Sequence, residues 1–387
     1  MANLFDPVQI GKLQLPNRLL MAPMTRSRAS EDGVVTALTA EYYRQRAGAG
    51  LIISESIQPS AVGQGYILTP GLHTADQVEG WRGVTDAVHE NGGRIVAQLT
   101  HTGRIGHSSL HPDGELPVAP SAVASGESLF SLDGMLEHPV PRAMTIQDIN
   151  ATVVDFASAA RNAIDAGFDG VELHGANGFL IHQFLADNTN LRTDAYGGPL
   201  ENRIRFALEV IAAVADVVGA DRTGIRLSPG SPYNNMEEAD PAPVYLGLLE
   251  ALAEQHLAYV HLVEVGDRAL TKALRSGWPG PLILNPHPSP DAFPASVDPA
   301  SEAVESGVAD AVALATMWLA NPDLDLRIKA GGPFNTADPS TFYGGDHRGY
   351  TDYPRLDQSQ NQGTGWVHAA DARPEGRDRR RPALGRR

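Results

Sequence analysis

The chain of 387 residues contains no cysteine. Disulfide bonds, thiolate zinc sites, a cysteine nucleophile and cysteine-bound iron–sulfur clusters are therefore excluded. The sequence also lacks any apolar run of the roughly 18 residues that cross a bilayer. Its amino terminus lacks the basic-then-apolar pattern of a secretion signal. We therefore expect a cytoplasmic protein with no membrane-spanning segment.

Positive charge is scarce, and several common catalytic motifs are absent. The formal net charge is −16, which argues against a nucleic-acid-binding surface. There is no GxGxxG after the first expected strand, no HExxH and no GxSxG. No two carboxylates are obviously placed for glycoside chemistry. The usual signatures of a dinucleotide fold, a zinc protease and a serine hydrolase are thus missing.

What the chain does contain is a series of short apolar segments separated by stretches with helical periodicity. Short apolar runs between turn residues are typical of buried parallel strands. Eight are expected, at residues 19–22, 51–55, 94–98, 170–173, 224–227, 258–263, 281–284 and 311–315. Helices are expected between them, among them residues 145–166 and 202–218, and residues 101–144 are expected to form a long irregular segment. This alternation predicts an α/β fold, most naturally a (β/α)8 TIM barrel, with a doubly wound open sheet as the alternative.

The two ends of the chain fall outside this alternation. Residues 3–18 alternate weakly around Gly11 and Lys12, which predicts a β-hairpin that plugs the barrel. After about Pro354 the sequence turns polar and then rich in Arg and Pro. We therefore assign residues 1–355 to one barrel domain and residues 356–387 to a disordered tail.

Polar side chains follow several predicted strands, at the end where barrel enzymes keep their active sites. His174 and Asn177 stand where a strand hands over to a helix, and both can donate a hydrogen bond without carrying a charge. Two neutral donors suit a carbonyl oxygen that becomes negative during reaction. Comparable positions are held by Thr25, Glu55, Gln98 and Arg226.

The types of these residues fit one ligand. Gln98 offers a paired donor and acceptor that match an imide edge. Arg226 offers a permanent cation, which suits an anion that forms during turnover. Thr25 adds a hydroxyl.

Histidines offer a rival interpretation, a metal-dependent hydrolase. His101, His107 and His111 lie in one irregular segment with His73 nearby, and histidine-rich barrel rims can bind divalent metals. Their spacing fits no strong ligand motif, and no acidic residue stands among the three. We therefore expect no metal site.

Longer motifs carry a family resemblance. Residues 174–185 read HGANGFLIHQFL, and residues 188–203 read NTNLRTDAYGGPLENR. NRLLMAPMTR at 17–26, QLTHTGR at 98–104, FYGG at 342–345 and GYTDYP at 349–354 agree. From about residue 3 to 355 the sequence resembles the old yellow enzyme family.

The resemblance implies a barrel that binds FMN non-covalently. NADH or NADPH would supply hydride, which passes to the β-carbon of an activated alkene such as an α,β-unsaturated carbonyl or nitro compound. His174 and Asn177 would be catalytic and bind the substrate oxygen. The expected cofactor contacts are Pro23, Met24, Thr25, Glu55, Gln98 and Arg226. The expected substrate pocket is formed by Tyr66, Thr100, Arg142, Phe179 and Tyr350. The only partners expected are small-molecule alkenes, and the chain would be a monomer or a homodimer.

Two pocket positions depart from the family pattern. Phe179 stands where the family usually has a tyrosine that protonates the substrate α-carbon, and phenylalanine has no proton to give. We hypothesise that water supplies this proton. Thr100 replaces a common tryptophan, so we expect a wider pocket there that favours bulkier substrates.

The segments expected to bind the FMN phosphate depart most from the family pattern. Residues 286–294 form a proline-rich run, although such sites usually use backbone amides that proline lacks. Leu314 to Thr316 stand where the family has an arginine. We predict weaker FMN binding unless a cation reaches in, the candidates being Arg268, Lys272 and Arg275. The alternative is a flavin-poor barrel that binds carbonyl or phenolic ligands with little or no turnover.

Overall fold

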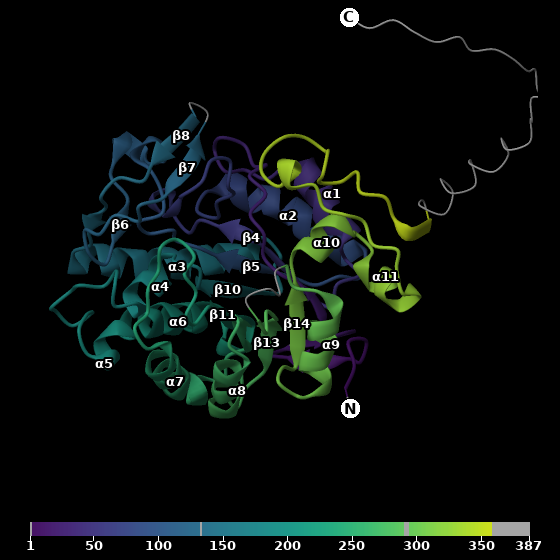
Figure 1. Ribbon diagram of the computed structural model, residues 1–387. Coiled ribbons are helices and arrows are strands. Elements are labelled where there is room, and N and C mark those ends of the chain that lie inside the picture. The colour runs from purple at the N-terminus through teal and green to yellow at the C-terminus, as the bar shows by residue number, and fades with distance from the viewer. Residues whose placement is uncertain (1, 132–133, 290–293, 358–387) are drawn as a thin grey trace, which may run out of the picture.

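The computed structural model describes residues 2–131, 134–289 and 294–357. Within these residues eight parallel strands close into a barrel, in the order β10-β11-β12-β13-β14-β3-β4-β5 (Figure 1). The strands are β3 (Leu19–Met21), β4 (Ile52–Ile57), β5 (Ile95–Leu99), β10 (Gly170–Gly175), β11 (Thr223–Leu227), β12 (Tyr259–Val263), β13 (Leu282–Asn285) and β14 (Ala311–Leu314). The closed barrel confirms the predicted fold and rules out the open sheet.

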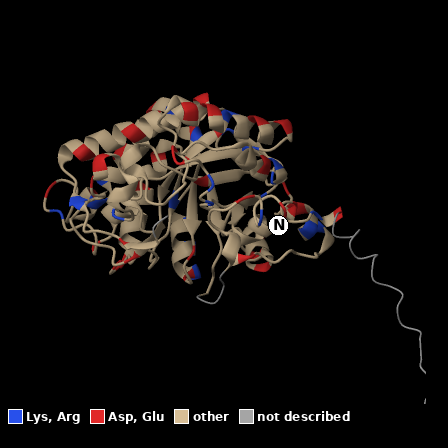
Figure 2. Ribbon diagram, turned by 90° about the horizontal axis from the view of Figure 1, so that it is seen from above, with Lys and Arg blue, Asp and Glu red and all other residues tan. Residues whose placement is uncertain are grey.

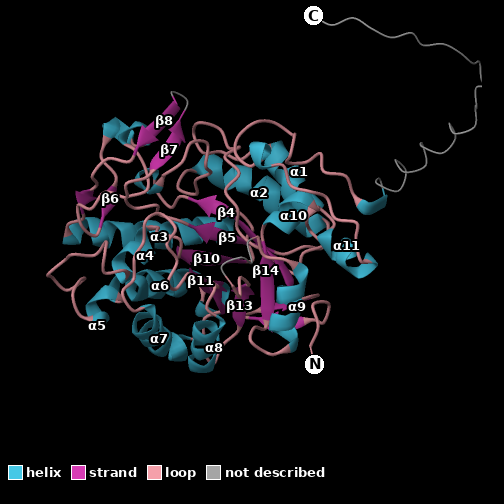
Figure 3. Cartoon of the chain, in the orientation of Figure 1, coloured by secondary structure: helices cyan, strands magenta, loops and turns pink. Residues whose placement is uncertain are grey.

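Helices cover the outside of the barrel (Figures 1 and 3). They are α1 (Ala37–Gln45), α2 (Ala75–Glu90), α3 (Ile146–Asp165), α4 (Leu180–Leu185), α5 (Leu200–Arg203), α6 (Arg205–Val218), α7 (Pro241–Leu252), α8 (Arg268–Gly277), α9 (Val297–Glu305), α10 (Thr316–Ala320) and α11 (Leu324–Ala330). Figure 2 shows Asp and Glu residues spread along the helices of this outer layer. No helix among the described residues is long and apolar enough to cross a membrane.

Helix α3 illustrates why these segments fold as they do. Thr145 caps its first turn by accepting a hydrogen bond from the Asp148 backbone N–H, while the Asp148 carboxylate accepts from the Thr145 N–H. Such a capping box satisfies two backbone donors that the helix leaves unpaired. The helix ends before Gly167, whose φ of +92° favours glycine. These signals are local, so the predicted span of 145–166 agrees with the observed one.

The N-terminal hairpin forms the floor of the barrel. Strands β1 (Val8–Ile10) and β2 (Leu13–Leu15) pair antiparallel, and their buried side chains join the cluster that fills the barrel interior. At the turn, the Lys12 backbone N–H donates to the Asp221 carbonyl at 3.1 Å, and the two side chains form an ion pair at 2.9 Å. Because Asp221 precedes β11, the hairpin closes the amino end of the barrel, as predicted.

The segment predicted to be irregular, from His101 to Met144, contains two small sheets. Strands β6 (Val118–Ala119) and β9 (Arg142–Ala143) pair parallel. Strands β7 (Ser128–Ser131) and β8 (Gly134–Glu137) pair antiparallel. The predicted disordered tail, residues 356–387, lies outside the described residues except for its first two.

Polar side chains gather inside the barrel toward the carboxyl ends of the strands. Successive residues of a strand face opposite sides, so Glu172 and His174 of β10 both point inward. The register pairs Glu172 with Gln98 of β5, and His174 with Arg226 of β11. Arg226 pairs in turn with His261 of β12. The interior therefore changes from apolar at the hairpin to polar at the mouth.

Candidate functional site

A cavity of about 700 Å³ lies at the carboxyl ends of the strands. This volume is in the range of small-molecule sites. The cavity brings together these predicted site residues: Pro23, Met24, Thr25, Tyr66, Gln98, His174, Asn177, Phe179 and Arg226. They come from segments spread over most of the chain, and the barrel gathers them at one rim.

His174 lies at the end of β10 and is 3% exposed. Its Nδ1 accepts a hydrogen bond from the Ala176 backbone N–H at 3.3 Å. Burial, and to a smaller extent the charge of Arg226, hold the pKa of His174 well below its usual value. The imidazole is therefore neutral, and with Nδ1 as acceptor its proton sits on Nε2. His174 can thus donate a hydrogen bond into the cavity without bringing a charge.

Asn177 adopts a left-handed backbone conformation, with φ of 55°, which asparagine tolerates better than most residues. Two contacts fix this turn. The Asn177 N–H donates to Ser228 Oγ at 2.8 Å, and Asn234 Nδ2 donates to the Asn177 carbonyl at 2.8 Å. The Asn177 side chain hydrogen-bonds to none of the described residues and is left to face the cavity. A second neutral donor therefore stands beside His174.

Arg226 supplies the positive charge of the site. One of its terminal nitrogens donates to Asn285 Oδ1 at 3.2 Å, and Asn285 Nδ2 is tied to the Ala313 carbonyl at 2.9 Å. Burial lowers the pKa of Arg226 to about 10, so the guanidinium stays charged at neutral pH. Its Nε is buried and has no partner among the described residues. An unpaired buried donor is costly unless a ligand accepts from it.

Glu172 links the polar residues beneath the cavity. The residue is fully buried, and its carboxylate accepts from Gln98 Nε2 at 2.8 Å and contacts His261 Nδ1 at 2.9 Å. Ser56 Oγ donates to Gln98 Oε1 at 3.1 Å. The Gln98 amide therefore keeps one N–H and one lone pair free for a ligand. Sequence reasoning missed Glu172, although a charged residue inside an apolar strand was a visible signal.

Aromatic side chains form the outer wall of the cavity. Phe179 stands edge-on to His174, with ring centroids 4.9 Å apart, and edge-on to Tyr66 at 6.3 Å. Tyr233 and Tyr343 also line the cavity, and their side chains are more than half exposed. Neither was predicted. Tyr343 lies in the FYGG motif, which could have signalled it, whereas Tyr233 lies in the irregular loop between β11 and α7 and had no such signal.

Glu55, predicted to contact the cofactor, does not line the cavity. The pairing of β4 with β5 shifts register between Ile53 and Ser56, and Glu55 lies within this irregularity, whereas Ser56 lines the cavity. The Glu55 carboxylate accepts from the Arg26 backbone N–H at 3.2 Å. Burial raises the pKa of Glu55 to about 7. Glu55 thus supports the backbone that follows Thr25 and stays outside the cavity.

Two predicted pocket residues also lie elsewhere. Arg142 is on the small β6–β9 sheet, where it pairs with Asp148 at 2.6 Å and leaves nearly half of its side chain exposed. Tyr350 is fully buried. Its ring stacks on Tyr42 with centroids 4.1 Å apart. Both lie in segments without regular periodicity, so sequence gave no direction for their side chains.

Thr100 lines a smaller recess beside the main cavity. The recess shares Ser56, Tyr66 and Phe179 with that cavity and leaves about 10 Å³ of room for the centre of a water molecule. The recess beside Thr100 is therefore the size of a water molecule. A wider substrate pocket at this position is not what the structure shows.

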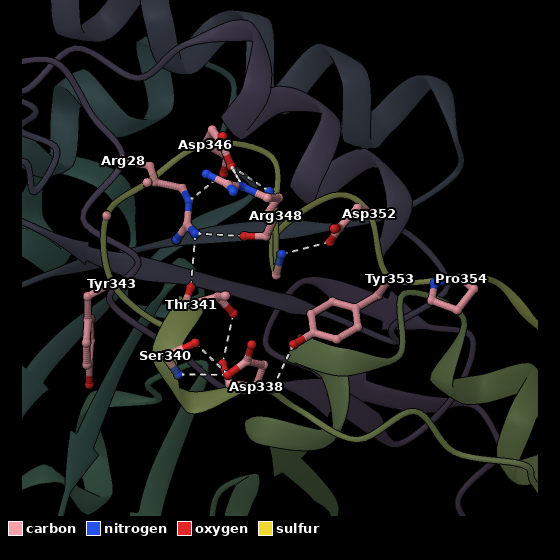
Figure 4. Close-up of a pocket in the computed structure, with 13 residues that line it drawn as sticks. Arg28, Asp338, Ser340, Thr341, Tyr343, Asp346, Arg348, Asp352, Tyr353 and Pro354 are labelled. Carbon is pink, nitrogen blue, oxygen red and sulfur yellow. Dashed lines mark hydrogen bonds and ion pairs between the residues drawn. The ribbon is translucent and has the colours of Figure 1, made fainter.

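The loop after α11 closes over the mouth and is held by Arg28. This residue donates to the backbone carbonyls of Thr341 at 3.0 Å, Asp346 at 3.1 Å and Arg348 at 3.3 Å (Figure 4). Its guanidinium also lies 4.4 Å from the centre of the Tyr350 ring. A further cavity of about 640 Å³ lies between Arg28 and this loop. Arg28 thereby fixes the segment that carries Tyr343 into the site.

The end of the cavity expected to hold phosphate is formed by Ala315, Thr316 and Leu319, at the start of α10. The three cations proposed to replace the missing arginine either form ion pairs with other residues or point to the outside. Arg268 pairs with Glu264, and Arg275 pairs with Asp310. Lys272 is exposed on α8. Residues 290–293 of the proline-rich run lie outside the described residues. Arg226 is thus the only Arg or Lys side chain among the described residues that line the cavity.

The residues of the cavity fit the isoalloxazine ring of FMN, including its pyrimidine edge. Arg226 has a buried donor free for a ring oxygen, and Gln98 has a free donor–acceptor pair for an imide edge. Pro23, Met24 and Thr25 supply a wall of backbone and apolar surface. A metal site is not indicated, since no three His, Asp or Glu side chains of the described segments are grouped for one.

Comparisons with known proteins agree with this geometry. The model of the NADH:flavin oxidoreductase / NADH oxidase family matches residues 3–335. A probable flavin mononucleotide-dependent alkene reductase of Leishmania infantum is 41% identical, covering 91% of this chain and 97% of that relative. A structure of morphinone reductase in complex with tetrahydroNAD is 44% identical with a TM-score of 0.87, covering 93% of this chain and 99% of that one. The old yellow enzyme homologue from Zymomonas mobilis is 39% identical with a TM-score of 0.87, covering 91% and 99%.

A (β/α)8 barrel with a neutral histidine–asparagine pair, an arginine and a free amide at its mouth defines a flavin-dependent oxidoreductase. The chain belongs to the NADH:flavin oxidoreductase / NADH oxidase family, within which it groups with the old yellow enzymes. The predicted family and the predicted use of FMN with a nicotinamide reductant are thereby confirmed.

Proposed function

We propose that this protein is an ene-reductase that reduces the C=C bond of α,β-unsaturated carbonyl or nitro compounds at the expense of NADH or NADPH. The observation that carries the proposal is the pairing of His174 with Asn177 at a cavity that also holds Arg226 and Gln98. Related proteins that are named as alkene and morphinone reductases support it.

His174 and Asn177 would bind the oxygen of the substrate. Both donors are neutral, so their hydrogen bonds strengthen as negative charge develops on that oxygen while hydride reaches the β-carbon. Donors placed in advance around such an oxygen each contribute roughly 10²- to 10³-fold in rate. FMN, when bound, supplies the hydride after NADH or NADPH has reduced it.

Arg226 and Gln98 would hold the cofactor's ring. The Arg226 cation would offset negative charge on a reduced flavin, and burial would strengthen that effect because charges there are poorly screened. The cavity's apolar lining, from Met24, Ile67 and Phe179 among others, excludes water from the reacting face. The predicted cytoplasmic location and the monomeric or homodimeric state stay predictions.

Three measurements on the purified full-length chain test the proposal. Bound flavin should give a yellow protein that bleaches under anaerobic NADH or NADPH and recovers its colour when cyclohexenone is added. His174→Ala and Asn177→Ala should each slow this recovery roughly 100-fold or more, while NAD(P)H still bleaches the flavin. A colourless chain that stays inactive with added FMN would instead favour the flavin-poor carbonyl- or phenol-binding barrel.

A further inference from the structure

A small polar recess opens beside Phe179. It is lined by residues of β4 and of the loops that follow β4 and β5, including Ser56, Gln58, Thr69, Thr100 and Thr102. These five side chains are polar, and most are at most 6% exposed. A cavity that admits about 10–15 Å³ of water centres, with two to four polar partners, holds an ordered water. The recess has about 10 Å³.

Thr100 is the residue in this recess whose hydrogen-bonding capacity is unused. Its Oγ1 is buried and has no partner among the described residues. The neighbouring hydroxyl groups already donate their protons. Thr102 Oγ1 donates to the Gly63 carbonyl at 3.1 Å, and Thr69 Oγ1 donates to the Tyr66 carbonyl at 2.9 Å. Their oxygens keep lone pairs. A water here would accept from Thr100 and donate to one of these oxygens.

The same recess adjoins the place where a proton is needed. Phe179 and Tyr66 line both the recess and the main cavity. Phe179 has no exchangeable proton, and its ring lies between those of His174 and Tyr66. Thr100 borders the recess, and phenylalanine at position 179 replaces the proton donor of the family pattern. The two departures from the family pattern are thus neighbours in space.

We propose that Thr100 positions a water molecule that protonates the α-carbon of the substrate. The inference rests on the proposed ene-reductase function. After hydride reaches the β-carbon, the substrate is an enolate whose oxygen is held by His174 and Asn177. An O–H bond of the water breaks and a C–H bond forms at the α-carbon. The hydroxide that remains takes a proton from bulk water through the cavity mouth, so protons and electrons balance.

The direction of proton delivery gives a test that turnover alone does not. With an enone that carries a methyl group on its α-carbon, a held water adds its proton to one face and produces one α-epimer in excess. Free solvent adds it to either face. Deuterated NADH marks the β-carbon in the same molecules, and the configuration there reports whether the substrate still binds in the same orientation.

The experiment compares FMN-loaded Thr100→Val, Thr100→Ser and wild-type protein on 2-methylcyclohexenone. Valine keeps the shape and removes the hydroxyl, so the ratio of α-epimers should fall about fivefold, the value of one hydrogen bond. The label at the β-carbon should not change. Serine keeps the hydroxyl and should retain the wild-type ratio. Adding Phe179→Tyr to Thr100→Val should restore the ratio, because a phenol then supplies the proton.

Two results would overturn the inference while leaving the ene-reductase function standing. One is an unchanged ratio in Thr100→Val with normal turnover. The other is a ratio that falls in Tyr66→Phe and not in Thr100→Val, which would make the Tyr66 phenol the donor. Absence of enone reduction by the flavin-loaded wild-type protein would refute the proposed function itself, and the inference with it.

Discussion

Glu172 is the negative partner of Arg226 beneath the cavity. The carboxylate raises the pKa of Arg226 against the larger lowering by burial, and burial keeps the pKa of His261 below its usual value, so His261 adds no charge. The substitution Glu172→Gln should therefore leave Arg226 uncompensated. Sulfite adds to an oxidised flavin and leaves negative charge on the ring, so sulfite binding reports the positive potential at the ring. The dissociation constant of sulfite should fall by about tenfold or more.

A matched control for this change is Glu209→Gln on α6, where the carboxylate accepts a hydrogen bond from Tyr196 at 2.9 Å. Sulfite affinity of that variant should equal that of the wild type. Weaker or unchanged sulfite binding in Glu172→Gln, measured by absorbance with FMN saturating, would show that Glu172 does not set the field at the ring.

Thr316 lies where the family has an arginine, at the end of the cavity expected to hold the FMN phosphate. The described cavity lining offers that end no Arg or Lys side chain. A charge-assisted contact is worth roughly 1.5–3 kcal/mol, so Thr316→Arg should tighten FMN binding about 10- to 150-fold. Flavin titration of dialysed protein, followed by fluorescence quenching, measures this. A nanomolar dissociation constant for the unaltered chain would contradict the prediction of weak binding.

At the residue scale, the structure brings together in one cavity the predicted residues His174, Gln98 and Arg226. Each lies at a strand end, where strand direction and alternation fix where the side chain points. Tyr350 was chosen and Tyr343 overlooked in the same C-terminal segment, because a loop has no period that tells one tyrosine's direction from the other's. The water-sized recess at Thr100 depends on packing between segments distant in sequence, which no local pattern encodes.

At the scale of elements, the loop that carries Tyr343 depends on Arg28. The substitution Arg28→Met would leave the carbonyls of Asp346 and Arg348 without their donor. The mouth should loosen, and KM for a cyclic enone should rise about tenfold while kcat changes little, because the lost contacts affect substrate binding and transition state alike. Steady-state kinetics with saturating NADH measure both constants.

Arg348→Met provides the control for this loop. Its side chain is 74% exposed and pairs with Asp346, and exposed ion pairs contribute little. The KM of this variant should stay within about twofold of the wild type. Equal effects of the two substitutions would mean that Arg28 acts only as surface charge.

The elements themselves were predictable to different degrees. The barrel strands are buried on both faces, so each leaves an apolar run in the sequence. Helix α8 was not predicted, because only Thr271 and Leu274 of it are buried and its apolar stripe is thin. The predicted helix over 202–218 is divided at Ile204 into α5 and α6. A break of this kind is too small to disturb the periodicity of the sequence.

For the whole molecule, buried neutral histidines predict loss of stability in acid. Burial lowers the pKa of His101 to about 3, and those of His138 and His287 to about 4. Unfolding returns them toward 6.5, so the unfolded chain binds more protons between these values. This contribution to stability is complete above about pH 6.5 and is lost as the pH falls toward 4.

Glu55 acts in the opposite sense, because its raised pKa of about 7 stabilises the folded state as the pH falls through that value. The three histidines outweigh this single group. Near pH 5 these four groups alone should take up about two protons on unfolding, which lowers the free energy of unfolding by about 2.7 kcal/mol per pH unit. His174, whose pKa is also lowered, acts in the same direction. Urea unfolding between about pH 6.5 and 5 measures the slope. A flat profile would mean that these histidines are already charged in the folded protein.

The hairpin floor also bears on how the protein can be handled. Strands β1 and β2 sit at the amino ends of the barrel strands, and the cavity lies at the carboxyl ends. A linker attached ahead of Leu4 therefore leaves from the side facing away from the mouth. Coupled to a bead or an electrode through that linker, the molecule would present its opening outward, and alkenes could enter without passing the support.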